Sequence, residues 1–272
     1  MWTHWLARFG MIVRGALFFV SGALALRLAL GQQHSSMTQL GAIQMIGMQP
    51  AGRVMLIFVA VGLAGYSMWG VIRGFLDPMG RGHHPIGIFQ RLGYLTSALA
   101  YAALLLATVQ YLTGMLAHVE ARDWTAELLA RPFGATIVVV VGLCWIFGAG
   151  VMQVVQGWKG SFERDLDLAH MGSTERQWAR ALGRIGMVSR GLVFIVIGIL
   201  LIASARHATP HADVGMDGAL MQLLNRPYGR VLLGAAGLGL MAFGCFSGLC
   251  ARWLRIPSSA PGSPPLPHRS TQ

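Results

Sequence analysis

The chain has 272 residues, of which 54% are hydrophobic and only 11% are charged, and its formal net charge is +11. A soluble domain carries about 25% charged residues because its surface must face water, so this composition excludes an ordinary soluble globule. A basic soluble protein would be a candidate for nucleic-acid binding. In a membrane protein, however, Lys and Arg collect in cytoplasmic loops, and we therefore expect no nucleic-acid partner.

Six long, almost uncharged stretches are candidates for membrane-spanning helices. A hydrocarbon core of about 30 Å needs roughly 20 helical residues to cross it, and a helix satisfies its own backbone amides in lipid. The first and fifth stretches reach this length only if an arginine near one end is included. In chain order the stretches are Met11–Leu30, Val54–Ile72, Leu92–Val119, Pro132–Trp158, Gly191–Ala205 and Val231–Ala251.

The distribution of basic residues predicts the orientation of the chain. The N-terminus, the second and fourth loops and the C-terminus together hold 14 Lys and Arg residues, whereas the first, third and fifth loops, together with Arg27, hold 7. Because basic residues accumulate on the cytoplasmic side, both termini are expected in the cytoplasm.

The same two-helix pattern occurs three times. The first helix of each unit begins with Arg-x-Gly, at Arg8–Gly10, Arg91–Gly93 and Arg184–Gly186. The second begins with Pro-x-Gly, at Pro50–Gly52, Pro132–Gly134 and Pro227–Gly229. The Arg-to-Pro separations are 42, 41 and 43 residues. Such self-similarity indicates tandem repeats. We assign repeat 1 to residues 1–80, repeat 2 to 81–160, a cytoplasmic amphipathic loop to 161–177, repeat 3 to 178–256 and a disordered Pro-rich tail to 257–272.

Each first helix carries a stripe of residues spaced by four. The stripes are Gly10, Arg14, Phe18 and Gly22; Gly93, Ser97, Tyr101 and Leu105; and Gly186, Arg190, Phe194 and Gly198. Small residues at such spacing let membrane helices approach closely, so the stripe is predicted to be a helix–helix seam. The proline of each second helix suits a first-turn position. Short amphipathic segments precede it at Thr38–Met48, Trp124–Ala130 and Asp217–Asn225, and they are predicted to be interfacial helices on the outer face.

These elements resemble those of the bacterial membrane family catalogued as domain of unknown function 1206. The resemblance rests on the R-x-G-x-x-x-R-G openings and on the G-A to P-x-G-R elements, such as Gly41-Ala42 to Pro50. It covers residues 5–255, and repeat two departs from it at Ser97 and at Thr125-Ala126. The resemblance implies three repeats in the bacterial cytoplasmic (inner) membrane. It implies no activity, substrate or cofactor.

Arg14 and Arg190 are the first candidate site. Each lies a turn or two inside the expected cytoplasmic boundary, on the stripe of its helix. An arginine at this depth can snorkel to headgroups or contact a carbonyl group. Alternatively, both side chains face the interior of the bundle and bind an anionic lipid headgroup or a small anion.

Three histidines form a second candidate site. His34, His118 and His211 lie 26, 27 and 27 residues after the opening arginine of their repeats, on the expected outer side. Repeats packed around a pseudo-threefold axis would bring these rings together in a geometry that zinc or copper accepts, with His207, Glu120 and Asp213 nearby. The alternative is that they are solvated loop histidines, because no dense ligand motif supports the site.

The function predicted from these features is non-enzymatic. All ten carboxylates lie in expected loops, although carriers and pumps usually need ionisable groups at mid-membrane. No nucleophile or nucleotide-binding motif is present, and no cofactor is predicted. We expect a scaffold or accessory protein that binds the phospholipid bilayer, anionic headgroups or a partner protein. A small channel or carrier formed by the three repeats is the alternative, and an outer-face metal-binding protein is a weaker one.

Overall fold

The computed structural model describes residues 2–32, 39–78, 80, 82, 84–114, 128–207, 224 and 227–253. Over these residues the chain is all-helical and has no β-strand, as predicted. Residues 134–159 form one continuous helical rod, which consists of the successive segments α6, η1 and α7. The elements are α1 (Trp2–Ala29), α2 (Gln39–Gly47), α3 (Gly52–Phe75), α4 (Pro85–Leu112), α6 (Gly134–Cys144), the π-helix η1 (Trp145–Val151), α7 (Met152–Lys159), the 3-10 helix η2 (Ser161–Asp165), α8 (Ser173–His207) and α10 (Gly229–Trp253).

Six helical segments are long and apolar enough to cross a membrane, so the chain is a multi-pass membrane protein and the predicted six-helix architecture is confirmed. These segments are Ala7–Ala29, Gly52–Phe75, Gly87–Leu112, Gly134–Lys159, Ser173–Ala203 and Gly229–Trp253.

Several helix boundaries differ from the predicted spans, among them the end of α4 and the start of α8. α4 ends at Leu112, seven residues before the predicted Val119, because Gly114 adopts the left-handed φ of +73° that commonly terminates helices. α8 begins at Ser173 and runs for 35 residues, so the second half of the fourth loop is the start of this helix. Glu175 lies in its first turn, where a carboxylate interacts favourably with the positive end of the helix dipole.

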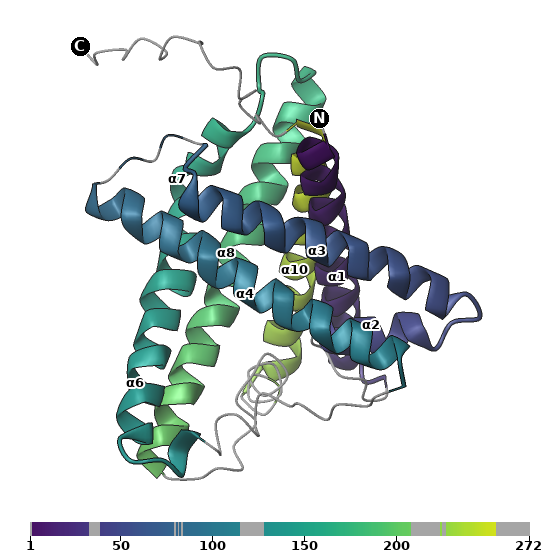
Figure 1. Ribbon diagram of the computed structural model, residues 1–272. Helices are drawn as coiled ribbons and strands as arrows, with labels where there is room; N and C mark the ends of the chain where they lie inside the picture. Colours follow the sequence, from purple (N-terminus) through teal and green to yellow (C-terminus); the bar gives the residue numbers. More distant parts are fainter. Residues whose placement is uncertain are drawn as a thin grey trace.

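The second helix of each repeat packs against the first helix of the next repeat. α3 packs on α4, the α6–η1–α7 rod packs on α8, and α10 returns to α1, so the order of contacts closes on itself. In the first and third repeats the two helices also pack on each other, whereas α4 touches its own rod only sparsely, at η1. In Figure 1, α3 and α4 run side by side at an incline to α1, α8 and α10.

Glycines allow the closest of these approaches, between α1 and α10. A Cβ atom on Gly15 would lie 2.7 Å from the carbonyl oxygen of Gly244, and one on Gly22 would lie 2.5 Å from that of Gly237. The predicted stripe therefore forms helix seams in the first repeat. In the second repeat only part of the stripe does so, because Tyr101 is buried against Tyr66 of α3 whereas a Cβ on Gly93 would meet no atom within 4 Å.

The prolines of the second helices lie earlier than predicted. α3, α6 and α10 begin at the glycine of Pro-x-Gly, so the proline precedes the N-cap residue and is not in the first turn. The N-cap residue Phe133 and the matching Tyr228 have φ of 63° and 62°. A Cβ on Gly134 would lie 1.8 Å from the carbonyl oxygen of Leu128. The chain folds back on itself in a tight turn here. This turn, and not the fixed φ of proline, is the reason that a glycine is needed at position 134.

The first predicted interfacial segment is confirmed as a helix. α2 occupies residues Gln39–Gly47, within the predicted Thr38–Met48, and packs against α1, α3 and α4. Most of Trp124–Ala130 and Asp217–Asn225 lies outside the described residues.

Buried apolar side chains fill the bundle in two clusters. The larger cluster surrounds the first half of α1 and extends to residues of the segment 160–172. We call the end of the bundle at which this segment lies the fourth-loop end. The smaller lies farther along α1, toward α2, and is built from α1, α8 and α10. Its members are Leu24, Ala25, Leu28, Ala29, Val193, Ile197, Leu200 and Leu233. Among the described residues, the part of these three helices that lies away from the fourth-loop end is therefore packed with aliphatic groups.

Candidate anion-binding site

Arg14 joins three helices through its guanidinium group. From α1 it donates one hydrogen bond to the hydroxyl of Tyr66 on α3 and another, of 3.0 Å, to Oγ of Ser247 on α10. The guanidinium carbon also lies 4.8 Å from the ring centroid of Tyr66 and 5.0 Å from that of Phe243. These contacts direct Arg14 into the bundle, and not outward to headgroups as a snorkelling side chain would be.

Arg190 lies in a box of three phenylalanines. Its guanidinium carbon is 4.7 Å from Phe18, 4.6 Å from Phe194 and 4.7 Å from Phe243, measured to the ring centroids. The residue is 9% exposed, and its buried Nε has no hydrogen-bond partner in the described part of the chain. Cation–π contacts of this kind stabilise a desolvated guanidinium by about 2 kcal/mol each, but they leave the Nε–H donor of Arg190 unused.

Phe243 connects the two arginines, since both guanidiniums approach its ring. The charges on Arg14 and Arg190 are close enough to act on each other. The other ionisable groups that act on Arg190 are the phenols of Tyr101 and Tyr66, and no carboxylate is among them. In the described part of the chain, two positive charges therefore share one aromatic interior in which phenols, and no carboxylate, act on Arg190.

A third cation, Arg73, stands at the edge of this group. Its guanidinium carbon lies 4.5 Å from the ring centroid of Tyr94, 5.7 Å from Trp69 and 5.8 Å from Tyr66. Tyr66 thus lies near both Arg14 and Arg73, and its own ring packs edge-on against Tyr101 at 4.5 Å. The sequence reading placed Arg73 among loop residues and did not identify Tyr66, Phe243 or Ser247.

The repeat explains how these residues meet. The aromatic residue ten positions after each opening arginine packs edge-on against the second helix of the preceding repeat. The pairs are Phe18 with Phe243, Tyr101 with Tyr66, and Phe194 with Trp145. Tyr66 and Phe243 both stand sixteen residues after the proline of their helices, where the second repeat has Gly148. This shared register is the signal that could have revealed the aromatic residues.

The opening arginine of the second repeat, Arg91, has a different role from Arg14 and Arg190. Arg91 donates from Nε to the carbonyl oxygen of Gly74 and from an Nη to that of Phe75, at 2.8 and 3.0 Å. It therefore satisfies carbonyl groups at the end of α3, which a helix leaves without internal partners. The structural carbonyl contact considered for Arg14 and Arg190 is made instead by Arg91.

The fourth-loop end is closed by folded chain. Phe162, Leu166 and Met171 are buried, and Phe162 stacks edge-on against Phe246 of α10 at 5.0 Å. The backbone N–H of Asp167 donates to the carbonyl oxygen of Trp253, at the last residue of α10. Together these contacts seat the loop over the end of α10.

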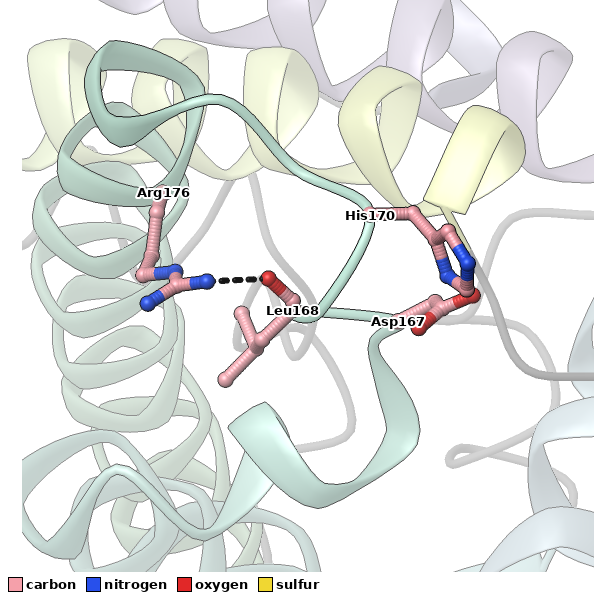
Figure 2. Close-up of polar contacts among 4 residues, drawn as sticks. All are labelled: Asp167, Leu168, His170 and Arg176. Carbon is pink, nitrogen blue, oxygen red and sulfur yellow. Dashed lines mark hydrogen bonds and ion pairs between the residues drawn. The ribbon is translucent and has the colours of Figure 1, made fainter.

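Polar contacts fix the shape of this cap. Arg176 of α8 donates to the carbonyl oxygen of Leu168, and Nδ1 of His170 lies 2.8 Å from the carboxylate of Asp167 (Figure 2). The carboxylate of Glu163 accepts a hydrogen bond of 3.0 Å from Nε of Arg180. The charged groups of the cap are thus used within it, or at the start of α8.

The three histidines of the second candidate site, His34, His118 and His211, lie outside the described residues, as do Glu120 and Asp213. Within the part of the chain that is described, no group of three or more His, Cys, Asp or Glu side chains could hold a metal ion. The metal site stays a prediction from sequence.

Comparison with known proteins gives the family. The chain matches the family described as Domain of Unknown Function (DUF1206) at residues 9–77, 92–160 and 185–254, one match for each repeat. It is 30% identical over 247 residues to a Bacillus subtilis (strain 168) protein named "Uncharacterized protein YxxB", covering 90% of this chain and 89% of that protein. No solved structure matches. With three tandem copies and a full-length relative, the resemblance seen in the sequence is confirmed, and the chain belongs to the DUF1206 family.

Proposed function

We propose that this protein is a non-enzymatic component of the bacterial cytoplasmic membrane that binds an anionic group between its repeats, at Arg14 and Arg190. The observation that carries the proposal is the pair of guanidiniums that share Phe243, each with a buried Nε that has no hydrogen-bond partner among the described residues. Tyr66 and Ser247 hold Arg14 in place from two other helices.

The energetics of buried charge support an anionic ligand. An isolated charge in an apolar interior is unfavourable by several kcal/mol unless it is paired. Aromatic rings offset part of this for Arg190 but accept no N–H···O hydrogen bond. A phosphate or carboxylate group would neutralise both cations and accept the unused donors, and charge-assisted hydrogen bonds of this type are among the strongest in proteins.

The alternative of a channel or carrier is less favoured. Conduction through the repeats would need a polar path along the bundle. The aliphatic cluster of α1, α8 and α10, which includes Leu24, Ile197 and Leu233, occupies the direction in which such a path would continue from the arginines. A binding site that ends inside the bundle suits this packing better than a route across it.

The proposed orientation keeps both termini in the cytoplasm. The start of α1 and the fourth loop lie at the same end of the bundle (Figure 1). That loop holds many of the Lys and Arg residues of the chain, and basic loops favour the cytoplasmic side. On this orientation the arginine pair lies in the cytoplasmic half of the membrane.

Arginine variants test the proposal. Purified protein would be stripped of lipid and incubated with either phosphatidylglycerol or inorganic phosphate, and the retained anion would be measured by native mass spectrometry. Because hydrogen bonds to charged groups are worth about 1.5–3 kcal/mol, Arg14→Gln and Arg190→Gln should each weaken retention about 10- to 100-fold. Arg27→Gln is the matched control, since Arg27 is an exposed arginine of α1, the helix that also carries Arg14, and its Nε donates to the side chain of Gln32.

A double variant, Arg14→Gln with Arg190→Gln, decides the question. Its thermal unfolding is monitored in parallel, so that loss of fold is distinguished from loss of binding. If the folded double variant retained as much of both anions as the parent protein, the proposed function would be wrong.

A further inference from the structure

We infer that the bound anion is the headgroup of a membrane lipid, which reaches Arg14 and Arg190 sideways, through the joint between α4 and η1 in the second repeat. This inference rests on the proposed function and adds the class of ligand and its route. Phe89 of α4 and Gly148 of η1 meet at this joint.

Routes along the bundle are closed in both directions from the arginines. Toward the fourth-loop end, a file of rings runs from Phe243 to Phe246 at 6.5 Å and from Phe246 to Phe162 at 5.0 Å. Leu166 and Met171 of the cap are buried in the same cluster. In the other direction the aliphatic cluster of α1, α8 and α10 fills the space. A free anion arriving from water would have to displace one of these packed layers.

The second repeat is the loosest part of the ring of contacts. Its two spans are each 17% buried inside the protein, whereas the other four are 44–56% buried. α4 is held by α3, and the α6–η1–α7 rod is held by α8, but α4 and the rod meet only sparsely, at η1. The joint between them can therefore open without disturbing the tighter seams of α1 with α3 and α10.

The residues at the joint differ from their counterparts in the other repeats. Gly148 occupies the register of Tyr66 and Phe243, and Ser97 occupies that of Arg14 and Arg190. A Cβ on Gly148 would lie 3.3 Å from Cζ of Phe89, so one ring tip covers the position where a large aromatic residue stands in the other repeats.

The π-helix lies at the same place. η1 spans Trp145–Val151 and includes Gly148. Single-turn π segments are rare and occur frequently at functional sites, because they interrupt the regular hydrogen-bond ladder of the helix. The Trp145 ring at the start of η1 packs on Phe194 of α8, so the segment is anchored on the side away from α4.

A lipid fits this geometry better than a soluble anion. Its headgroup would reach the guanidiniums through the joint while its acyl chains remained on the apolar surface outside. That surface is present on both sides of the joint, where Leu99 and Leu106 of α4 are 73% and 63% exposed and Phe147 of η1 is 62% exposed. Burial of each acyl CH₂ contributes about 0.8 kcal/mol, which an inorganic anion lacks.

Cross-linking the joint tests the route. In a background with Cys144, Cys245 and Cys250 replaced by Ala, the pair Phe89→Cys and Gly148→Cys would be joined by a short bifunctional thiol reagent. Protein cross-linked before incubation with phosphatidylglycerol should lose lipid retention, down to the level of the double arginine variant. Protein cross-linked after incubation should keep its lipid through washing. The uncross-linked cysteine pair is the control for the substitutions.

A second variant guards against failure of the cysteine pair to fold. Gly148→Phe restores the aromatic residue of the other repeats, and it should slow loading of phosphatidylglycerol while thermal unfolding shows a folded protein. Equal rates of phosphatidylglycerol loading in the uncross-linked, cross-linked and Gly148→Phe proteins would overturn the sideways route. If inorganic phosphate loaded the cross-linked protein, or was retained as strongly as phosphatidylglycerol, the inference that the ligand is a lipid would be wrong. In each of these cases arginine-dependent retention would still support the proposed function.

Discussion

The three glycines that follow the opening arginines hold equivalent positions in sequence but not in structure. A Cβ on Gly10 would lie 2.5 Å from the backbone N of Tyr66, and one on Gly186 would lie 2.5 Å from Cα of Phe243. A Cβ on Gly93 would meet nothing within 4 Å. We therefore predict that Gly10→Ala and Gly186→Ala destabilise the protein and that Gly93→Ala does not.

Two opposing effects give the magnitude. Alanine is more favourable than glycine inside a helix by about 0.5–1 kcal/mol, and this gain applies at all three positions. At Gly10 and Gly186 the new methyl group meets backbone atoms, which cannot rotate away, so the helices must separate. Overpacking of this kind typically costs about 1–3 kcal/mol, and more when backbone has to move. The net expectation is a loss of about 1–2 kcal/mol at Gly10 and Gly186 and a gain of about 0.5–1 kcal/mol at Gly93.

Thermal unfolding in detergent, followed by the fluorescence of the eight tryptophans, measures the difference. One kcal/mol shifts the Tm of a chain of this size by about 2–4 °C, so the variants should separate clearly. Gly248→Ala is a further control, because this glycine of α10 also has no atom within 4 Å of its Cβ position. Equal Tm shifts for the three alanine variants at Gly10, Gly93 and Gly186 would refute this reasoning. They would show that the first helix is not packed more tightly at this glycine in the first and third repeats than in the second.

Three further predictions concern the turns, caps and loop contacts. Phe133→Gly and Tyr228→Gly should each raise the free energy of unfolding by about 1 kcal/mol, because both residues hold a left-handed φ; Ala51→Gly, at φ −101°, should not, and equal effects would contradict this reasoning. Arg91→Gln should lower stability by about 1–2 kcal/mol in chemical denaturation, since it uncaps the carbonyl groups of Gly74 and Phe75. Glu163→Gln should cost only about 0.5 kcal/mol through its pair with Arg180, and a cost that persisted undiminished in high salt would show that more than an exposed ion pair was lost.

The fold was largely predictable because its determinants are local. Length and hydrophobicity identify a membrane helix from its own residues, and the repeated Arg-x-Gly and Pro-x-Gly openings count the units. The ends of the helices were harder to predict from the sequence. The helical start of α8 at Ser173 carries the charged residues of a loop, and only its packing and capping show that it continues the membrane helix. The turn before α6 likewise depends on the close approach of Gly134 to Leu128, and no pattern in the sequence indicates that approach.

The candidate site was predictable only in part, because it depends on which helices meet. The stripe identified Arg14 and Arg190, and their four-residue spacing to Phe18 and Phe194 is visible in the sequence. Their meeting at Phe243 requires that α10 return to α1, which no local pattern states. Ser247 of α10 was missed for the same reason, whereas Tyr66 could have been found from the register that it shares with Phe243.

The second repeat shows why departures from an internal pattern carry information. If its two helices simply tolerated more variation, the altered positions would be scattered over their surfaces. Instead Ser97 replaces the arginine and Gly148 replaces the aromatic residue of the same stripe-and-ring arrangement. The helix that carries Gly148 becomes a π-helix there, and α4 contacts its own rod only sparsely at this point. A ring of contacts that is tight in two repeats and weak in the third has a defined side from which its interior can be reached. On the proposed function, the anion that enters from that side binds Arg14 and Arg190.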